Sequence, residues 1–324
     1  MKIENIVNEV LMAEKNIRAH INTTEVLKSG YLSSLTGGEV YLKLENQQKT
    51  GSFKLRGAVN KVLSLTDEEC EIGIITASTG NHGLAFATAS GLRDHVNAQL
   101  FVPKTASQMK LNKIKALGNL EINEYGNDSS ATEEYAKKFA EDHYMTWVSP
   151  YNDLKIIGGQ GTVGVEIAQQ LGPDLDAVLI TIGGGGLISG TASYLKSVLP
   201  DVLIMGCVPA NSPEVYWAIR DKKYVESMSL DTISDGSAGG YEKGAITLDI
   251  IEAVTDGYQE VSEDEIKNAM KLIYKHDQQI IEGAAGVSVA GFIKNKDLFK
   301  GKKVCIVICG GNINPELFES IVNN

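Results

Sequence analysis

The chain has 324 residues, of which 43% are hydrophobic and 22% charged, and 41 acidic against 30 basic side chains give a formal net charge of -11. This length suits one large domain or two joined ones, and the acidic balance gives no electrostatic support for binding nucleic acid or an anionic membrane surface. Four scattered cysteines without a CxxC pair exclude a disulfide-stapled scaffold and argue against structural zinc. No apolar run approaches the roughly 20 residues that cross a bilayer, and a signal-peptide pattern is lacking, so we expect a cytoplasmic protein.

Apolar residues at helical spacing over 3–17 predict an amphipathic opening helix. A strand is expected at 40–44 and a helix from Ser52, after which short apolar strands alternate with helices in two series. The first series has predicted strands at 72–77, 99–102, 120–123 and 145–148, and predicted helices at 81–90, 107–117 and 130–140. The second has predicted strands at 177–182, 202–207 and 304–308, and predicted helices at 162–170, at 187–198, from Ser212-Pro213 and from Ser262 with its capping-box spacing.

Alternation of short buried strands with helices is typical of parallel sheets that are covered on both faces. We therefore expect an α/β protein with two open, twisted parallel-sheet domains and a cleft between them. The larger domain is expected to comprise 1–66 and 149–324, and the smaller, mobile domain is expected to comprise 67–148.

Four consecutive glycines, Gly183, Gly184, Gly185 and Gly186, follow a predicted buried strand and precede a predicted helix. Backbone N–H groups and the helix dipole can hold a phosphate group at such a turn. The spacing of a dinucleotide fingerprint and the sequence of a Walker motif are both missing. The pattern therefore indicates a site for a small phosphate monoester, with a flexible turn as the alternative.

Lys54 stands in the first turn of a predicted helix, within the segment TGSFKLRG at 50–57. In a desolvated cleft at a helix N-terminus the ammonium form is disfavoured, so the amine can act as a nucleophile or a base. The alternative is an ordinary surface lysine.

A polar turn at 78–83 follows the next predicted strand and contains Ser78, Thr79, Gly80, Asn81 and His82. Hydrogen-bonding residues and glycines at a strand-to-helix junction can form a nest for a substrate carboxylate. The alternative is a simple helix N-cap, which Ser78 or Thr79 could supply without any ligand.

These segments resemble a known family. The motifs SFKLRG (52–57), STGNHG (78–83), GGGG (183–186) and CGGN (309–312), in this order and spacing, resemble those of the pyridoxal-phosphate enzymes of fold type II. Within that group the chain is most similar to serine/threonine dehydratases and serine racemases, over essentially its whole length. The resemblance implies the tryptophan synthase β-like fold, pyridoxal 5'-phosphate in the cleft, a small amino acid as substrate and a homodimer.

The resemblance also implies roles for individual residues. Lys54 would bind the cofactor covalently, Phe53 would pack beside its ring, and Asn81 would hydrogen-bond to the ring hydroxyl. The glycines at 183–186, with Leu187, would hold the cofactor phosphate. The turn at 78–82 would bind the substrate.

Cys309 would face the pyridine nitrogen of the cofactor. A neutral thiol, unlike a carboxylate, does not keep this nitrogen protonated, so charge stays near Cα, which favours elimination over transamination. The predicted function is therefore a dehydratase that converts a small β-hydroxy amino acid, such as L-serine or L-threonine, to a 2-oxo acid and ammonia. A small buried hydrophobic residue is the alternative for Cys309.

Three positions depart from the family pattern. Thr79 stands where serine racemases have Ser and many threonine dehydratases have Ala, so a racemase with Lys54 and Thr79 as opposed bases is an alternative. Val208 stands where a Glu of a divalent-cation site is expected, so no metal is predicted, and Glu214 is a weak substitute ligand. Thr132 replaces an Arg that contacts the substrate hydroxyl in mammalian serine racemase, so the substrate need not be the same.

Two further alternatives concern substrate and activity. The stretch 234–244 looks like the branch that contains hydroxyectoine-utilisation dehydratases, which leaves a related hydroxy amino acid open. A catalytically silent binding protein on the same fold is the other alternative, and the intact Lys54 argues against it.

Glu282 matches a family motif near the cofactor, although a helix-capping acid has the same signature.

Overall fold

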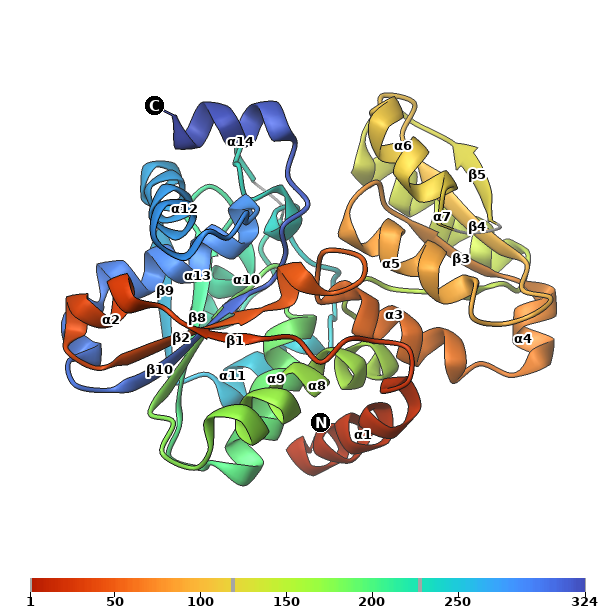
Figure 1. Ribbon diagram of the computed structural model, residues 1–324. Coiled ribbons are helices and arrows are strands. Elements are labelled where there is room, and N and C mark those ends of the chain that lie inside the picture. Colours follow the sequence, from red (N-terminus) through yellow and green to blue (C-terminus); the bar gives the residue numbers. More distant parts are fainter. Residues whose placement is uncertain (1, 118–119, 227–228, 324) are drawn as a thin grey trace.

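The computed structural model describes residues 2–117, 120–226 and 229–323, and their strands form two separate sheets (Figure 1). In the six-stranded sheet the order is β1 (Val26–Lys28), β2 (Glu39–Leu44), β10 (Lys303–Ile308), β7 (Ala177–Thr181), β8 (Leu203–Pro209) and β9 (Gly257–Val261). In the four-stranded sheet the order is β5 (Glu121–Glu124), β4 (Ala98–Val102), β3 (Ile74–Ala77) and β6 (Thr146–Trp147).

All neighbouring strands pair in parallel except the edge strand β1, which runs antiparallel to β2. The central strand β7 is buried at each of its residues, which explains its unbroken apolar sequence. The prediction of an α/β protein with two open parallel sheets is confirmed, with the antiparallel β1 as an addition.

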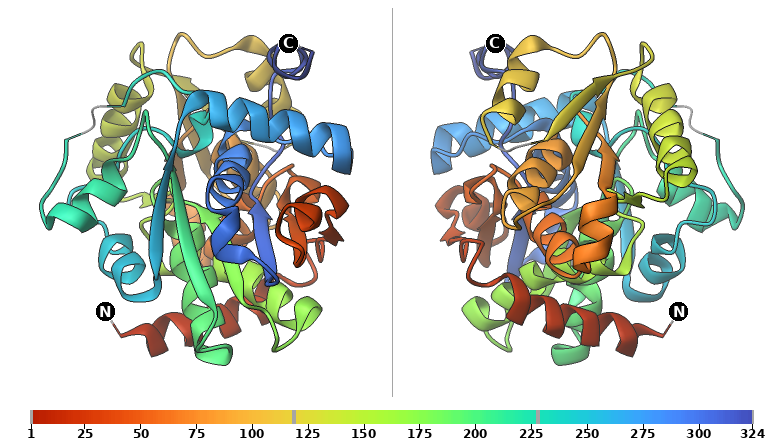
Figure 2. Two further views of the ribbon diagram at one scale, coloured as in Figure 1. Left: turned by 90° about the vertical axis from the view of Figure 1, so that its left-hand side faces the viewer. Right: turned by 90° about the vertical axis from the view of Figure 1, so that its right-hand side faces the viewer.

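Helices cover both sheets (Figures 1 and 2). Around the four-stranded sheet lie α4 (Asp67–Ile72), α5 (Asn81–Ser90), α6 (Gln108–Lys115) and α7 (Ser129–Asp142). The other helices are α1 (Ile3–Ile17), α2 (Gly30–Thr36), α3 (Lys54–Leu63), α8 (Leu154–Leu171), α9 (Gly186–Val198), α10 (Glu214–Asp221), α11 (Thr247–Val254), α12 (Glu263–Asp277), α13 (Gly283–Lys294) and α14 (Pro315–Val322), with short 3-10 turns η1 (Glu45–Gln47), η2 (Asp235–Ser237) and η3 (Lys296–Phe299). We call the four-stranded sheet with α4 to α7 the small lobe, and the other elements the large lobe.

Most predicted elements are present with shifted ends. The capping box at Ser262 is confirmed, because its hydroxyl accepts from the backbone of Glu265 while the Glu265 carboxylate accepts from the backbone of Ser262. Helix α10 begins one residue later than expected, with Pro213 at the N-cap. Helix α4 was not predicted, although Thr66 and Glu69 form a capping box at its start.

Glycines bring the helices under Lys54 into backbone contact. A Cβ atom added at Gly159 of α8 would lie 2.5 Å from the carbonyl oxygen of Arg56 in α3. One added at Gly190 of α9 would lie 2.1 Å from the carbonyl oxygen of Ile157 in α8. Real Cβ atoms do not approach other atoms this closely, so only glycine permits these helix crossings. Helix α3, which begins with Lys54, is therefore held against α8.

The apolar face of α3 packs into the core of the small lobe. Its buried side chains Leu55, Val59 and Val62 belong to one cluster with Phe86 of α5 and Ile156 of α8. The start of α3 is thus fixed by both lobes. The division of the chain into 1–66 with 149–324 and 67–148 stays a prediction.

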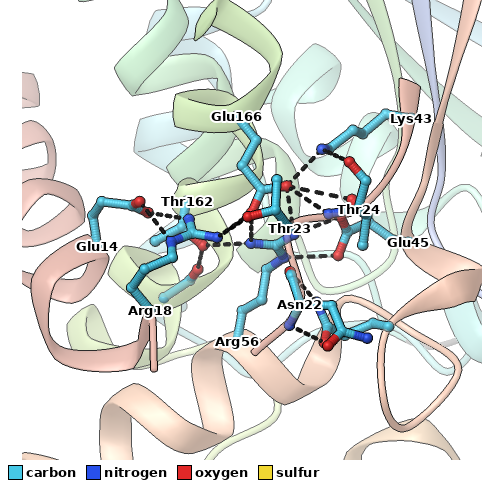
Figure 3. Close-up of polar contacts among 12 residues, drawn as sticks. Glu14, Arg18, Asn22, Thr23, Thr24, Lys43, Glu45, Arg56, Thr162 and Glu166 are labelled. Carbon is cyan, nitrogen blue, oxygen red and sulfur yellow. Dashed lines mark hydrogen bonds and ion pairs between the residues drawn. The ribbon is translucent and has the colours of Figure 1, made fainter. Parts of the chain in front are cut away.

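A buried cluster of charged side chains lies beneath α3 (Figure 3). The guanidinium of Arg56 is fully buried and donates to both oxygens of Glu45, at 2.7 and 2.8 Å, and to both oxygens of Glu166 in α8, at 2.8 and 3.0 Å. Lys43 of β2 also donates to Glu166, at 2.6 Å. Bidentate pairing of this kind orients a guanidinium strictly. The cluster therefore connects α3 to β2 and α8 two residues beyond Lys54.

Candidate active site

A cavity of about 460 Å³ is lined by residues from both lobes. From the large lobe come Lys54, Pro150, Asp235, Gly236, Ala238, Glu282 and 312–315. From the small lobe come Ala77, Ser78, Thr79, Gly80, Asn81, His82, Leu84, Phe101, Pro103, Ser107, Lys113, Ser129, Thr132 and Glu133. The two sequence motifs around Lys54 and Ser78 therefore meet in one place.

Lys54 is the first residue of α3, which confirms its predicted place in the first turn, although the helix begins two residues later than expected. Its Nζ donates a 2.9 Å hydrogen bond to the carbonyl oxygen of Pro150, in the segment that joins β6 to α8. Burial lowers the pKa of this amine to about 8, although Cys309, Glu282 and Glu133 oppose the shift. A lysine with this pKa can both accept and donate a proton near neutral pH.

The turn after β10 is joined to the start of α3. The backbone N–H of Phe53 donates to the carbonyl oxygen of Cys309 at 3.1 Å, and Ser52 forms a β-bridge with Gly310. The Cys309 side chain is buried, and burial raises the pKa of its thiol well above the ordinary range, so the thiol is neutral. The ring of Phe53 lies 5.3 Å from Lys54 Nζ.

The turn between β3 and α5 presents backbone to the cavity. Gly80 is the N-cap of α5, and no side chain caps this helix in the described chain. The alternative that Ser78 or Thr79 caps the helix is therefore wrong; Ser78 Oγ instead accepts a 3.2 Å bond from the N–H of Gly80. An uncapped helix N-terminus is a favourable place for an anion.

His82 lines the cavity, but its ring is bonded to the protein. Nε2 lies 3.0 Å from the carbonyl oxygen of Val148 and 3.1 Å from Oγ1 of Thr76. Because a carbonyl oxygen only accepts, Nε2 carries the proton. Burial, together with the charge of Lys54, lowers the pKa of His82 to about 3, so the ring stays neutral and holds the end of β3 to the segment after β6.

Gly183, Gly184 and Gly185 lie between β7 and α9, and Gly186 is the first residue of α9, so the predicted glycine turn between strand and helix is present. None of the four glycines is among the residues that line the cavity, and Tyr151 and Ser237 pack against the turn. A Cβ atom at Gly184 would lie 2.3 Å from the Tyr151 ring, and one at Gly183 would lie 2.9 Å from Cα of Ser237. Gly185 is the N-cap of α9 with φ +90°, a conformation that favours glycine. Leu187, in the first turn of α9, is buried.

These features fit a phosphate-bearing ligand. The loop at 183–186 leaves no room for side chains, and no side chain of the described residues caps α9, so its first turn is suited to an anion. The buried hydroxyl of Ser52, beside Lys54, has no hydrogen-bond partner among the described residues. Buried hydroxyls are usually bonded, so this atom indicates a missing acceptor or donor.

Two residues named in the comparison with the family pattern, Glu214 and Thr132, have hydrogen-bond partners within the protein. Glu214 is buried and accepts from the hydroxyls of Ser212, at 2.7 Å, and Ser229, at 2.6 Å. Val208 is buried in β8. The hydroxyl of Thr132 donates to backbone carbonyl oxygens in its own segment, so its proton is not offered to a ligand.

Several cavity residues carry roles that the sequence alone did not reveal. The carbonyl of Pro150 and the carboxylate of Glu133 come from segments in which the sequence shows no motif, and Asp235 belongs to the stretch 234–244, which the sequence relates only to the choice of substrate. The motif around Glu282 left a helix cap and a cofactor contact open. In the structure Glu282 does not cap α13, and it bonds to Asn81.

Comparisons with known proteins identify the family. The family model described as "Pyridoxal-phosphate dependent enzyme" matches residues 17–310. The chain belongs to this family of pyridoxal-phosphate dependent enzymes. The resemblance inferred from the motifs is thereby confirmed, and with it the cofactor, pyridoxal 5'-phosphate.

Three relatives span nearly the whole chain of this pyridoxal-phosphate enzyme. L-threonine ammonia-lyase of Thermotoga maritima is 37% identical over 97% of this chain and 77% of its own. Serine racemase of Dictyostelium discoideum is 36% identical over 97% of both chains, and its crystal structure, which covers 95% of this chain and 98% of its own, superposes with a TM-score of 0.87. The β-hydroxyaspartate dehydratase of Paracoccus denitrificans is 33% identical over 94% of this chain and 96% of its own.

These relatives place the enzyme among pyridoxal-phosphate dehydratases and racemases. Within the described residues no helix is both long and apolar enough to cross a membrane. The cytoplasmic location and the homodimer stay predictions.

Proposed function

We propose that this enzyme is a dehydratase that removes water from a small β-hydroxy amino acid, such as L-serine or L-threonine, and yields a 2-oxo acid and ammonia. The observation that carries this proposal is a contrast between two cavity residues. Lys54 has an amine with a pKa of about 8, whereas Thr79, which lines the same cavity, offers only a hydroxyl, which is a weak acid and a weak base. Dehydration needs one base and racemisation needs two.

Lys54 is proposed to hold the cofactor and then to act on the substrate. When bound, the cofactor accepts the electron pair that remains after the Cα–H bond breaks. The freed amine of Lys54 takes the α-proton, and the resulting ammonium can give a proton to the departing β-hydroxyl. Burial supports this role, because it keeps the pKa of the amine near the pH at which both transfers occur.

The remaining proposed site residues bind and orient. The uncapped N-terminus of α5, at 78–82, would hold the substrate carboxylate through backbone N–H groups. The glycines at 183–186 and Leu187 would hold the cofactor phosphate at the start of α9, and Phe53 would pack beside the ring. The neutral thiol of Cys309 would face the pyridine nitrogen without protonating it, which favours loss of the β-hydroxyl.

A second candidate function is serine-type racemisation. It is favoured by the hydroxyl of Thr79, which lines the same cavity as Lys54 and could protonate the face of Cα that the lysine does not reach. The 36% identity to a serine racemase is consistent with this candidate. An unassisted threonine hydroxyl is a weak acid and a weak base, so we expect racemisation to be the minor activity.

One assay separates the two functions. The purified enzyme with pyridoxal 5'-phosphate is incubated with L-serine, D-serine, L-threonine or β-hydroxyaspartate, and both the 2-oxo acid and the enantiomers are measured. A 2-oxo acid without the opposite enantiomer supports the dehydratase, and the reverse result supports the racemase. Thr79→Ala is the matched variant, because it removes the proposed second base while Lys54 is unchanged. It should abolish any racemisation and leave dehydration in place.

The cofactor attachment has its own experiment. Borohydride reduction followed by peptide mapping is expected to place the pyridoxyl group on Lys54. A label on another lysine would contradict the site, and neither product from any of the four substrates would contradict the proposed substrate class.

A further inference from the structure

The carboxylate of Glu282, a residue of the large lobe, contacts the small lobe. It is the N-cap of α13, but it makes no capping hydrogen bond to that helix. Its side chain is buried, and the amide nitrogen of Asn81, the first residue of α5, donates to Oε1 at 2.8 Å and to Oε2 at 3.1 Å. The backbone N–H of Asn312 also donates to Oε2, at 3.1 Å. A carboxylate from the large lobe thus receives donors from both lobes.

The other end of the Asn81 amide is held as well. Nδ2 of Asn312 donates to Oδ1 of Asn81 at 2.7 Å, and it also donates to the carbonyl oxygen of Thr50 at 2.7 Å. An ionised carboxylate and a backbone carbonyl oxygen can only accept hydrogen bonds. Thr50 therefore fixes which end of the Asn312 amide is nitrogen, and Glu282 fixes which end of the Asn81 amide is nitrogen. Because Thr50 and Glu282 stand at the two ends of this series of hydrogen bonds, each of the two amides has only one possible orientation.

Two glycines provide the space for this arrangement. A Cβ atom at Gly310 would lie 2.5 Å from Oε1 of Glu282. A Cβ atom at Gly51, where φ is +74°, would lie 2.7 Å from Oδ1 of Asn312. The glycines that flank Lys54 and follow Cys309 are therefore needed to admit the side chains of Glu282 and Asn312.

We propose that Glu282 and Asn312 are positioning residues that orient the Asn81 amide toward the cofactor ring and thereby connect the two lobes at the cofactor. This inference rests on the proposed function, in which Asn81 is a ligand of the cofactor. An amide nitrogen has two N–H groups, and one of them is sufficient for Glu282. The other is then available to the ring hydroxyl, in an orientation that the protein sets before the cofactor binds.

The charge of Glu282 makes this arrangement sensitive to pH. Burial, together with the charge of Asp235 in η2, raises the pKa of its carboxyl to about 7, although the bonds from Asn81 and Asn312 and the charge of Lys54 oppose the shift. The neutral thiol of Cys309 is the other titratable group that faces it. Above pH 7 the carboxylate accepts from both donors, whereas the protonated acid loses an acceptor site and gains a donor. The orientation of Asn81 is therefore expected to loosen as the pH falls through about 7.

The experiment measures cofactor binding to the cofactor-free full-length protein at pH 6 to 9, by the absorbance of the bound pyridoxal 5'-phosphate and by its dissociation constant. Glu282→Gln is expected to bind the cofactor roughly tenfold more weakly at pH 8, the usual effect of losing a hydrogen bond to a charged group. The absorbance spectrum of the unmodified protein is expected to change with pH near 7, and that of Glu282→Gln should lack this change. Asn312→Ala is expected to weaken binding in the same direction.

Glu9→Gln is the matched control. Glu9 is also a buried carboxylate, bonded to Lys155 at 2.9 and 3.0 Å, but it does not line the cavity. This variant should keep the affinity and the pH dependence of the unmodified protein. Because Glu282 and Asn312 act in one chain of hydrogen bonds, the double variant should lose less affinity than the two single losses multiplied together.

The proposal is overturned if Glu282→Gln and Asn312→Ala keep the affinity and spectrum of the unmodified protein, even if their unfolding midpoints fall. Should Glu282→Gln fail to fold, unchanged cofactor binding by Asn312→Ala alone overturns it. The readout needs no turnover, so a wrong substrate class would leave it intact. If the pyridoxyl group is found on a lysine other than Lys54, it is the proposed function that fails.

Discussion

Lys54 donates a 2.9 Å hydrogen bond to the carbonyl oxygen of Pro150, so the cavity lysine is joined to the segment that connects the two lobes. The bond gives the amine a defined position before any ligand is present. Because an N–H of Lys54 makes this bond, the lone pair of the neutral amine points away from the Pro150 carbonyl oxygen. The same lysine is desolvated by its surroundings.

Lys54 is expected to react with an amine-selective reagent at a lower pH than ordinary lysines. Burial lowers the pKa of its amine to about 8, so half-maximal labelling of the cofactor-free protein should occur near that pH. Mass spectrometry of the labelled peptide measures this directly. Lys138, whose side chain is 74% exposed, serves as the internal reference for a solvent-exposed amine. Equal labelling profiles for the two lysines would contradict the prediction.

Gly184→Ala is expected to weaken binding of pyridoxal 5'-phosphate strongly. The new Cβ would lie 2.3 Å from the Tyr151 ring, so either the ring or the glycine loop must move. Titration of the cofactor measures the loss. Gly30→Ala is the control, because a Cβ at the start of α2 meets no atom within 4 Å. Wild-type cofactor affinity in Gly184→Ala would mean that this loop does not hold the phosphate.

Glu166 makes stability depend on pH in the acid range. Burial alone would raise its pKa, but Arg56 and Lys43 outweigh burial and hold it at about 2, below the ordinary 4.5 (Figure 3). A carboxyl group whose pKa is lower in the folded than in the unfolded protein stabilises the fold, and it does so fully at a pH above its unfolded pKa. For Glu166 this stabilisation is lost as the pH falls from about 4.5 to 2.

Glu166→Gln should therefore flatten the loss of stability between pH 4.5 and 2. At pH 7 the same variant should lower the free energy of unfolding by about 3 to 5 kcal/mol, because Arg56 keeps a buried charge with fewer partners. Urea unfolding at several pH values measures both effects. Glu39→Gln, which removes an exposed carboxylate paired with Lys28, should change little. An acid limb as steep as that of the unmodified protein would refute the assignment.

Lys137→Met is expected to cost no more than about 1 kcal/mol of stability, although the residue bridges the two lobes. Its Nζ lies 2.7 Å from Glu133 in its own helix and 3.1 Å from Glu242 of the large lobe, and these side chains remain partly exposed. Because exposed ion pairs are screened by salt, the difference between the two proteins should shrink as the salt concentration rises. Urea unfolding in low and high salt tests this. A salt-independent loss above about 3 kcal/mol would indicate a buried role.

The alternation of elements could be predicted because strands β7 and β10 are largely apolar runs that are followed by the glycine turns at 183–186 and 310–311. The first part of α8 could not, since Gly158, Gly159 and Gly161 read as helix breakers. In the structure these glycines are the points where α8 contacts other elements, and tertiary packing outweighs their poor helix propensity. Helix α14, after the turn at 309–312, was missed for lack of a long apolar pattern.

The site was predictable where its chemistry is local. Lys54 and the turn at 78–82 are recognisable from neighbouring residues, and they do line one cavity. The direction of the Glu282 side chain depends on where α13 lies relative to α5, which no local pattern encodes. The role of the Pro150 carbonyl could not be predicted either, because it depends on where the backbone lies, whereas sequence patterns give information about side chains.

The backbone contacts of α8 with α3 and α9 have a consequence for changing the substrate range of this enzyme. Any larger side chain at Gly159 or Gly190 would push whole helices apart, so the packed helices α3, α8 and α9, the first of which carries Lys54, tolerate almost no substitution at these positions. The small-lobe wall of the cavity is formed at Ser107, Ser129 and Thr132 by residues that already carry side chains. Libraries of variants for altered substrate selectivity should therefore vary the residues of that wall and leave the glycines between α3, α8 and α9 unchanged.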